Sequence, residues 1–324
     1  MTRAVVFAYH NVGVRCLKVL LAHGIDVPLV VTHDDDPGET IWFGSVARAA
    51  ADYSIPAITP ADPNASGIVA HVAAARPDFI FSFYYRMMLG PALLALAPRG
   101  ALNMHGSLLP KYRGRAPVNW AILRGETETG ATLHYMTGKP DDGDIVAQTA
   151  VPILPDDVAS EVFDKVTVAA ELALHRALPA LIDGTAPRVR QDLARGAYFR
   201  GRKPDDGVID WSQSATAIHN LVRAVAPPYP GARTRVHGHP ARLLRTRVLD
   251  AAPPHPAAPA FDVADGRIIA RCGGGGSLQV LGLEIDGAII GPAAFARWRA
   301  VHAAALPGRI GAREPAPGSP DNDH

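Results

Sequence analysis

The chain from residue 1 to residue 185 alternates short apolar runs with stretches of helical period. The apolar runs predict strands at residues 4–8, 27–31, 79–83, 101–105 and 131–136. The stretches around them predict helices at residues 14–22, 44–53, 68–75, 116–123 and 159–182. Two of the runs, 4–8 and 79–83, are apolar on both faces, which favours parallel strands covered by helices on each side. The alternation predicts a Rossmann-like, doubly wound α/β domain with a mostly parallel sheet.

Beyond Gly184 the pattern changes to short segments separated by turn residues. Strands are predicted at residues 234–236, 241–248, 267–271 and 278–283, with spacing typical of a small antiparallel β domain, and we expect an OB-like barrel. The expected organisation is an α/β domain at 1–185, a linker at 186–205 and a smaller C-terminal β-rich domain at 206–311. Residues 312–324 are rich in Pro, Gly, Asp and Glu and are predicted to be disordered.

Composition excludes several classes of protein. The chain has 32 Lys and Arg against 31 Asp and Glu, so no nucleic acid partner is expected. No apolar run is long enough to span a membrane, and the apolar part of the N-terminus is too short for a signal peptide. Cys16 and Cys272 lack CxxC spacing, and the acidic residues after His33 have no second cluster at ligand spacing. We expect a cytoplasmic protein with no disulfide, no metal and no membrane insertion.

The segment at residues 100–117 carries the most informative polar residues. If 101–105 is a strand, Asn103 and His105 project to one face, at the strand end where α/β sheets form their ligand crevice. An Asn amide can donate to a developing oxyanion and a His can move a proton, which suits acyl transfer. The alternative is structural: the Asn holds the following loop and the His satisfies a carbonyl. This segment alone leaves both interpretations open.

A second polar segment follows the predicted strand 131–136. It is the acidic loop Thr137-Gly-Lys-Pro-Asp141-Asp-Gly143-Asp. A carboxylate on such a loop could orient a neighbouring His and make it more basic. A short acidic run with glycine is also a common solvated turn, so the loop by itself decides nothing.

Together, the motifs resemble those of a known family. Asn103-Met-His105, the Ser-Leu-Leu-Pro-Lys-Tyr-Arg-Gly run at 107–114 and Asp141-Asp-Gly143 are similar to the signature of formyltransferases that use 10-formyltetrahydrofolate. The resemblance covers residues 3–240 and, more loosely, the chain to residue 305. It implies an enzyme that transfers a one-carbon group, with 10-formyltetrahydrofolate as co-substrate and Asn103, His105 and Asp141 as catalytic residues.

The resemblance also implies binding residues. On the folate side these are Met87, Met88, Leu89, Arg115, Thr137, Gly138, Lys139 and Pro140. On the side of a nucleotide-sugar substrate they are Tyr9, His10, Lys111, Tyr112 and Arg113. Arg and Lys are the donors that a pyrophosphate favours.

Flanking motifs at residues 5–10, 81–86, 111–117 and 124–130 resemble one branch of the family. This branch N-formylates UDP-4-amino-4-deoxy-L-arabinose, for aminoarabinose modification of lipid A in lipopolysaccharide biosynthesis and for polymyxin resistance. Its bifunctional members carry a second, NAD-dependent decarboxylase half. Here no GxGxxG follows a strand, and the glycines at 273–276 indicate a hairpin or loop. We therefore expect a formyltransferase without the decarboxylase half.

Three other functions are compatible with parts of this pattern. A methionyl-tRNA formyltransferase would share the three catalytic residues, but binding a polyanion favours a basic surface and the net charge is +1. A formyltransferase for another nucleotide-linked amino sugar would also have the same three residues. A non-catalytic folate- or nucleotide-binding module is disfavoured, because a binder has no use for a proton shuttle.

Overall fold

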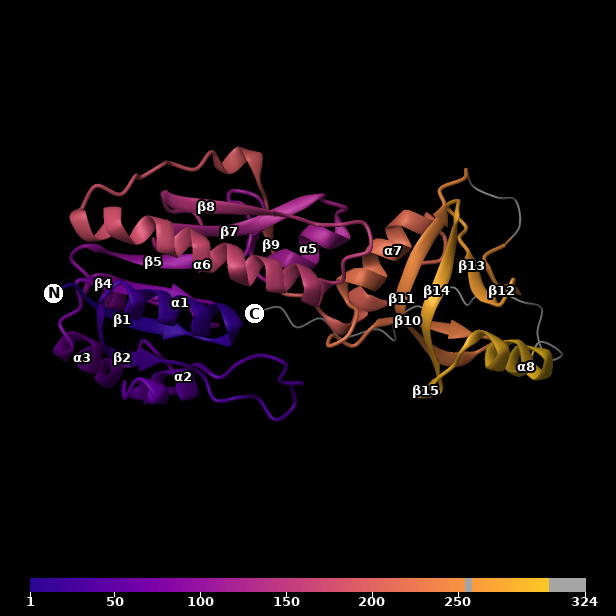
Figure 1. Cartoon of the computed structure of the whole chain (residues 1–324), viewed down its shortest axis with the longest axis horizontal. Helices are drawn as coiled ribbons and strands as arrows, with labels where there is room; N and C mark the ends of the chain where they lie inside the picture. Colours follow the sequence, from indigo (N-terminus) through magenta and orange to yellow (C-terminus); the bar gives the residue numbers. More distant parts are fainter. Residues whose placement is uncertain (254–257, 303–324) are drawn as a thin grey trace, which may run out of the picture. The chain divides into compact units, whose positions relative to one another are not determined.

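The computed structural model describes residues 1–253 and 258–302 (Figure 1). The chain forms two compact units. The first comprises Met1–Ala121, Glu126–Pro155 and Glu161–Gly201. The second comprises Ile122–Gly125, Asp156–Ser160 and the described residues from Arg202 onward. The predicted disordered tail at 312–324 lies outside the described residues.

The first unit is built on a seven-stranded sheet of order β3-β2-β1-β4-β5-β7-β8. Its five parallel strands are β1 (Arg3–Ala8), β2 (Asp26–Val31), β3 (Ala57–Ile58), β4 (Phe79–Phe83) and β5 (Gly100–His105). On the β5 side, β7 (Glu128–Tyr135) pairs antiparallel with β5, and β8 (Ile145–Pro152) pairs antiparallel with β7. The predicted mostly parallel α/β sheet is confirmed, and the antiparallel β5–β7 pair is the part that organises the site described below.

Helices cover both faces of this sheet (Figure 1). They are α1 (His10–Ala22), α2 (Val46–Asp52), α3 (Ser66–Ala74), α4 (Pro91–Leu94), α5 (Pro117–Leu123) and α6 (Ala159–Asp183). Val5 and Phe7 of β1 pack with Val72 of α3 and Leu93 of α4. On α1 and α6, Arg15 and Glu171 form a two-pronged ion pair at 2.7 and 2.8 Å, so these two helices lie side by side. The β4 strand is buried along its whole length, as its continuous apolar run predicts.

The second unit is an antiparallel sheet of order β10-β11-β14-β13-β12, with β15 paired to β14. The strands are β10 (Ala232–Val236), β11 (His239–Asp250), β12 (Ala260–Ala264), β13 (Arg267–Arg271), β14 (Ser277–Ile285) and β15 (Ala288–Ile289). Helix α7 (Ala215–Ala224) contributes Ile218 and Val222 to its core, and α8 (Pro292–His302) contributes Phe295. The predicted β-rich C-terminal domain is confirmed. The two helices were not predicted, and the 273–276 glycines form the turn between β13 and β14.

A short irregular segment follows α6. It contains the 3-10 turns Leu193–Arg195 and Pro204–Gly207 and the strand β9 (Tyr198–Phe199), which pairs in parallel with β6 (Arg113–Gly114). Both cysteines, Cys16 and Cys272, are buried and free. In the two ranges that the structure covers, no helix is long and apolar enough to cross a membrane.

The buried β4 strand provides a test of the first unit's core. Phe81 is fully buried and stacks on Phe83, with ring centroids 5.5 Å apart. Phe81→Ala should lower the free energy of unfolding by ~3–5 kcal/mol, because it removes a buried ring and leaves a cavity. Urea denaturation measures this loss. Tyr53→Ala, at a half-exposed position, is the control and should change stability by less than ~0.5 kcal/mol. Equal effects of the two substitutions would contradict the described core.

Candidate active site

Asn103 and His105 lie at the end of β5 and share a face, as the strand periodicity predicts. Asn103 is paired across the sheet with His134 of β7, and Asn103 Nδ2 lies 3.2 Å from His134 Nε2. His105 is buried, and its Nε2 donates to the carbonyl oxygen of Tyr112 at 2.8 Å. The β5–β7 pairing therefore places an amide and two imidazoles side by side.

Asp141 joins this group from the loop between β7 and β8. Its Oδ1 lies 3.4 Å from Asn103 Nδ2, 3.5 Å from His105 Nδ1 and 3.5 Å from His134 Nε2. Its Oδ2 accepts a hydrogen bond of 2.8 Å from the backbone N–H of Gly114. The structure thus brings the three predicted catalytic residues together around one carboxylate and adds His134 to them.

The environment of Asp141 sets its charge. Burial opposes ionisation of the carboxyl. The positive charge of His105, the hydrogen bond and charge of His134 and the Gly114 N–H outweigh that burial and hold the pKa of Asp141 well below its usual range. The side chain is only 10% exposed, so these interactions act with little screening by solvent. Asp141 is therefore a buried, fixed negative charge.

The second nitrogen of each imidazole fixes the position of its hydrogen. His105 Nε2 lies 2.8 Å from the Tyr112 carbonyl oxygen, and His134 Nδ1 lies 2.8 Å from the Tyr135 carbonyl oxygen. Because a carbonyl oxygen only accepts, both of these nitrogens carry a hydrogen. The other ring nitrogens, His105 Nδ1 and His134 Nε2, face Asp141.

His134 was not among the predicted site residues. It lies inside the predicted strand 131–136, where a lone histidine has no distinguishing local signal. Its role depends on the antiparallel register that pairs it with Asn103. That register is a long-range property, which periodicity within one strand does not reveal.

Two positions in the loop that carries Asp141 have unusual backbone constraints. Asp141 adopts a left-handed backbone conformation with φ of +56°, which is uncommon for a residue other than glycine. A side chain at Gly143 would collide with the carbonyl oxygen of Tyr135, so the chain passes this point only without a Cβ. The Asp-x-Gly motif therefore combines the buried carboxylate with the glycine that lets the loop return to β8.

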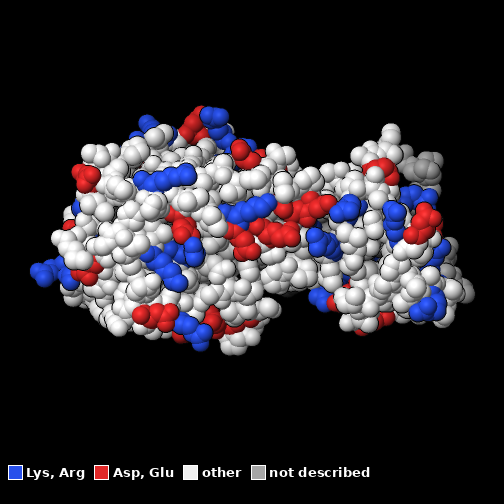
Figure 2. Space-filling model, in the orientation of Figure 1, with Lys and Arg blue, Asp and Glu red and all other residues white. Residues whose placement is uncertain are grey.

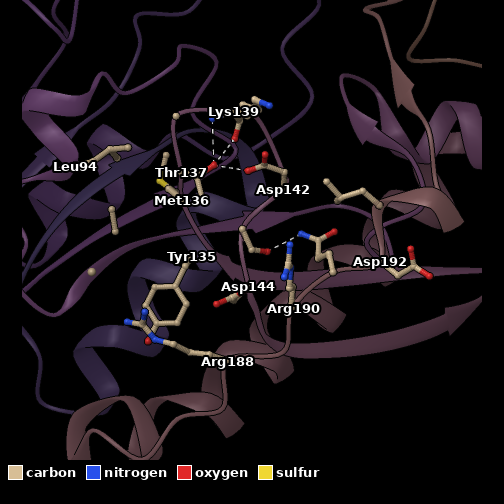
Figure 3. Close-up of a pocket in the computed structure, with 16 residues that line it drawn as sticks. Leu94, Tyr135, Met136, Thr137, Lys139, Asp142, Asp144, Arg188, Arg190 and Asp192 are labelled. Atoms are coloured by element: carbon tan, nitrogen blue, oxygen red, sulfur yellow. Dashed lines mark hydrogen bonds between the residues drawn. The ribbon is translucent and has the colours of Figure 1, made fainter.

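A cavity of about 1110 Å³ lies against the same loop (Figure 3). Its wall includes Thr137, Gly138 and Lys139 from the loop and Tyr135 and Met136 from the end of β7. Figure 3 shows Arg188 lying against the ring of Tyr135, with its guanidinium carbon 3.8 Å from the ring centroid. The Thr137 hydroxyl lies within hydrogen-bond distance of Asp142 and of the Lys139 carbonyl oxygen.

The predicted folate contacts divide into two groups. Thr137, Gly138 and Lys139 line the cavity. The others are not among its lining residues in the described part of the chain: Met87, Met88, Leu89, Arg115 and Pro140. Met87, Met88 and Arg115 are exposed, whereas Leu89 is buried in the core of the first unit.

Two of the predicted substrate-side residues are buried. Tyr9 donates its hydroxyl hydrogen to Asp35 at 2.8 Å, and the Arg86 guanidinium lies over its ring. His10 packs against Phe43, with ring centroids 3.8 Å apart. Burial, with a smaller contribution from the charge of Arg86, lowers the pKa of His10 to about 3. In this structure Tyr9 and His10 are therefore buried and held by neighbouring side chains of the first unit.

The other three predicted residues shape the loop above His105. Lys111 pairs with Glu126 at 3.2 Å, and the Tyr112 hydroxyl donates to the same carboxylate at 2.8 Å. Arg113 donates to the carbonyl oxygen of Gly196 at 3.3 Å. These contacts position the Tyr112 carbonyl, which accepts from His105, and the neighbouring Gly114 N–H, which donates to Asp141.

Two family models match the chain over most of its length. Residues 10–178 match the formyl transferase family and residues 202–299 match the formyl transferase C-terminal domain. The chain therefore belongs to the formyl transferase family.

Solved structures share this fold. The N-formyltransferase of Helicobacter canadensis, in complex with folinic acid and dTDP-3-aminofucose, has a TM-score of 0.66 at 19% identity, over 86% of this chain and 99% of that chain. WlaRD, a sugar 3N-formyl transferase solved with dTDP and 5-N-formyl-THF, has the same score and identity over 89% and 99%. HypX from Aquifex aeolicus, in complex with tetrahydrofolic acid, has a TM-score of 0.58 at 16% identity, over 93% of this chain and 48% of that chain.

Within residues 1–253 and 258–302, no group of three or more His, Cys, Asp or Glu side chains is placed to hold a metal ion. His33 instead accepts a hydrogen bond from the backbone N–H of Arg86 at 3.0 Å and stacks on Tyr85.

Substitution of Gly143 tests the described backbone path of the loop. Gly143→Ala should lower the free energy of unfolding by ~1–3 kcal/mol, because the added Cβ collides with the Tyr135 backbone. Gly138→Ala is the matched control, since a Cβ at Gly138 meets nothing within 4 Å. Urea denaturation of the two variants measures the difference. A Gly143→Ala protein as stable as Gly138→Ala would contradict the described loop.

The ionised Asp141 predicts a pH dependence of stability. Its folded-state pKa lies below the value of about 3.9 for an unfolded chain, so its contribution is fully present above that value. The contribution is lost as the pH falls through the folded-state pKa. We expect the difference in unfolding free energy between wild type and Asp141→Asn to shrink as the pH falls below about 4. Urea denaturation at a series of pH values measures this difference, and one that grows on acidification would show that the sign is wrong.

Proposed function

We propose that this protein transfers a formyl group from 10-formyltetrahydrofolate to the amine of a nucleotide-linked amino sugar. One observation carries the proposal: the Asp141 carboxylate lies within 3.5 Å of Asn103, His105 and His134, on a loop that also lines a cavity of about 1110 Å³. Membership of the formyl transferase family supports the reaction class. The folate compounds and dTDP-sugar bound to the structures of similar fold support the two substrates.

The cavity is the site that we propose for the folate. Its volume is slightly above the range of about 300–1,000 Å³ that is usual for small-molecule pockets. Its wall combines apolar side chains such as Leu94 and Met136 with charged ones such as Lys139, Arg188 and Arg190. Thr137, Gly138 and Lys139 would contact the folate there, and Met87, Met88, Leu89, Arg115 and Pro140 are proposed as further contacts outside the cavity wall. Asn103, His105 and Asp141 are not among the residues that line the cavity in the described part of the chain, and the loop that carries Asp141 links the cavity to them.

The catalytic roles follow from the hydrogen-bond geometry. As the neutral amine adds to the formyl carbon, Asn103 Nδ2–H and protonated His105 would stabilise the negative charge that develops on the formyl oxygen. His105 would then give its proton to the departing N10 of the folate, as the bond between N10 and the formyl carbon breaks, and would be protonated again by the proton that the formylated amine nitrogen loses. The Tyr112 carbonyl holds His105 Nε2, so the nitrogen that exchanges this proton would be Nδ1. Asp141 would orient the imidazole and balance its charge.

For the acceptor we propose UDP-4-amino-4-deoxy-L-arabinose, formylated for lipid A modification. The support is the resemblance of residues 81–86 and 124–130 to the branch that uses this sugar. Lys111, Tyr112 and Arg113 lie on the loop next to His105, on the side proposed for the nucleotide sugar, and Tyr9 and His10 would support that side from below. Figure 2 shows acidic and basic side chains interspersed on the face in view, and the net charge of +1 gives no excess for a tRNA acceptor.

Turnover tests both the reaction and the acceptor. The protein is incubated with 10-formyltetrahydrofolate and one acceptor at a time: UDP-4-amino-4-deoxy-L-arabinose, dTDP-3-aminofucose or methionyl initiator tRNA. Release of tetrahydrofolate with a nucleotide sugar alone is expected, and it should be fastest with the UDP-sugar. Release with tRNA alone, or with no acceptor, would contradict the proposal.

Substitution of the two proposed oxyanion-stabilising residues tests their roles. Asn103→Ala and His105→Ala should each lower kcat by ~10²–10³, the usual effect of losing one oxyanion donor. His175→Ala is the control, because His175 is exposed on α6 and contacts His23. Values of kcat within about threefold of wild type, in stably folded variants, would rule out the assignment.

A further inference from the structure

Gln191 makes two hydrogen bonds to the loop that carries Asp141. It lies after α6, it is 8% exposed, and it is 50 residues from Asp141 in the sequence. Its Nε2 donates to the carbonyl oxygens of Asp141 at 3.0 Å and of Gly143 at 2.7 Å. Both partners can only accept, so the amide orientation is fixed by them. One side chain therefore holds the backbone on both sides of Asp142.

The same orientation leaves the other half of the amide unsatisfied. Gln191 Oε1 is buried and has no hydrogen-bond partner among the residues that the structure describes. A buried acceptor without a partner is costly, and such atoms are few in folded proteins. The two hydrogen bonds that Gln191 donates to the loop offset this cost, and they account for the orientation of the amide.

The backbone of the loop at Asp141 needs stabilising contacts from residues outside the loop. Asp141 has a φ of +56°, a conformation that costs free energy in a residue with a side chain. The contacts of Thr137 with Lys139 and Asp142 stabilise the beginning of the loop. At its end, the two backbone bonds between Ile145 and Val189, of 2.8 and 2.9 Å, fix the segment that presents Gln191. Gln191 thus connects Asp141 to a segment that is hydrogen-bonded to Ile145 of β8.

We propose that Gln191 is a positioning residue, whose amide holds Asp141 in the place where it meets Asn103, His105 and His134. The inference rests on the proposed function only for its effect on turnover. Gln191 also lines the cavity proposed for the folate, so the cavity wall and the position of the carboxylate depend on one side chain.

The first test needs no substrate. Gln191→Met keeps the length of the side chain and removes both donors. With the carboxylate no longer held among His105, His134 and the Gly114 N–H, the pKa of Asp141 should rise toward its ordinary value, as followed by ¹³C NMR of the labelled carboxyl. Gln148→Met is the matched control, since Gln148 also donates twice, to Leu109 and Thr132 at 2.9 Å, but does not contact the loop. An Asp141 titration unchanged in Gln191→Met, or shifted equally in Gln148→Met, would overturn the proposal.

The second test is a double-mutant cycle on turnover. Gln191→Met should lower kcat about tenfold to a hundredfold, the usual effect of misplacing a catalytic group, with little change in KM for the amine. In the Asp141→Asn background the same substitution should change kcat less than about threefold, because Gln191 acts through Asp141. An equal loss in both backgrounds would show a general structural effect and overturn the proposal. If no acceptor is formylated, the proposed function fails while the NMR result still decides the role of Gln191.

Discussion

The site depends on one carboxylate that lies among four nitrogen atoms. Asp141 Oδ1 lies within 3.5 Å of one amide and two imidazole nitrogens, and Oδ2 accepts from the Gly114 backbone. A buried charge is stable only when it is paired and hydrogen-bonded, so these groups must be in place together. They come from β5, β6, β7 and the β7–β8 loop, so the order of strands in the sheet is what allows the cluster to form.

Backbone conformation and backbone hydrogen bonds, as well as side-chain chemistry, explain which residues stand in the sequence motifs. Gly114 has a φ of +97°, and a side chain there would collide with the carbonyl oxygen of Phe199 on the paired strand β9. Only a glycine can follow this path and still present its N–H to Asp141. The neighbouring Tyr112 contributes its carbonyl to His105, while its ring stacks on Phe199 at 5.0 Å. The loop after His105 therefore supplies a backbone acceptor to His105 and a backbone donor to Asp141.

Local patterns predicted the elements and part of the site. The alternation of residues along a strand placed Asn103 and His105 on one face, and the loop position of Asp141 allowed it to reach them. His134 and Gln191 could not be found in this way, because their roles depend on the β5–β7 register and on a contact across 50 residues. Helix α7 did have a local signal, since Ser214 caps it and Ile218 and Val222 lie on its buried face. This signal was missed because α7 lies among short segments that predict strands, and a β-rich domain was expected.

The tautomers of the two histidines test the Asp141-centred account most directly. Solution ¹⁵N NMR of histidine-labelled protein reports which ring nitrogens carry a hydrogen. The account predicts a hydrogen on His105 Nε2 and on His134 Nδ1 wherever the protein is folded, because both nitrogens donate to carbonyl oxygens. A bare His105 Nε2 or a bare His134 Nδ1 would contradict the account.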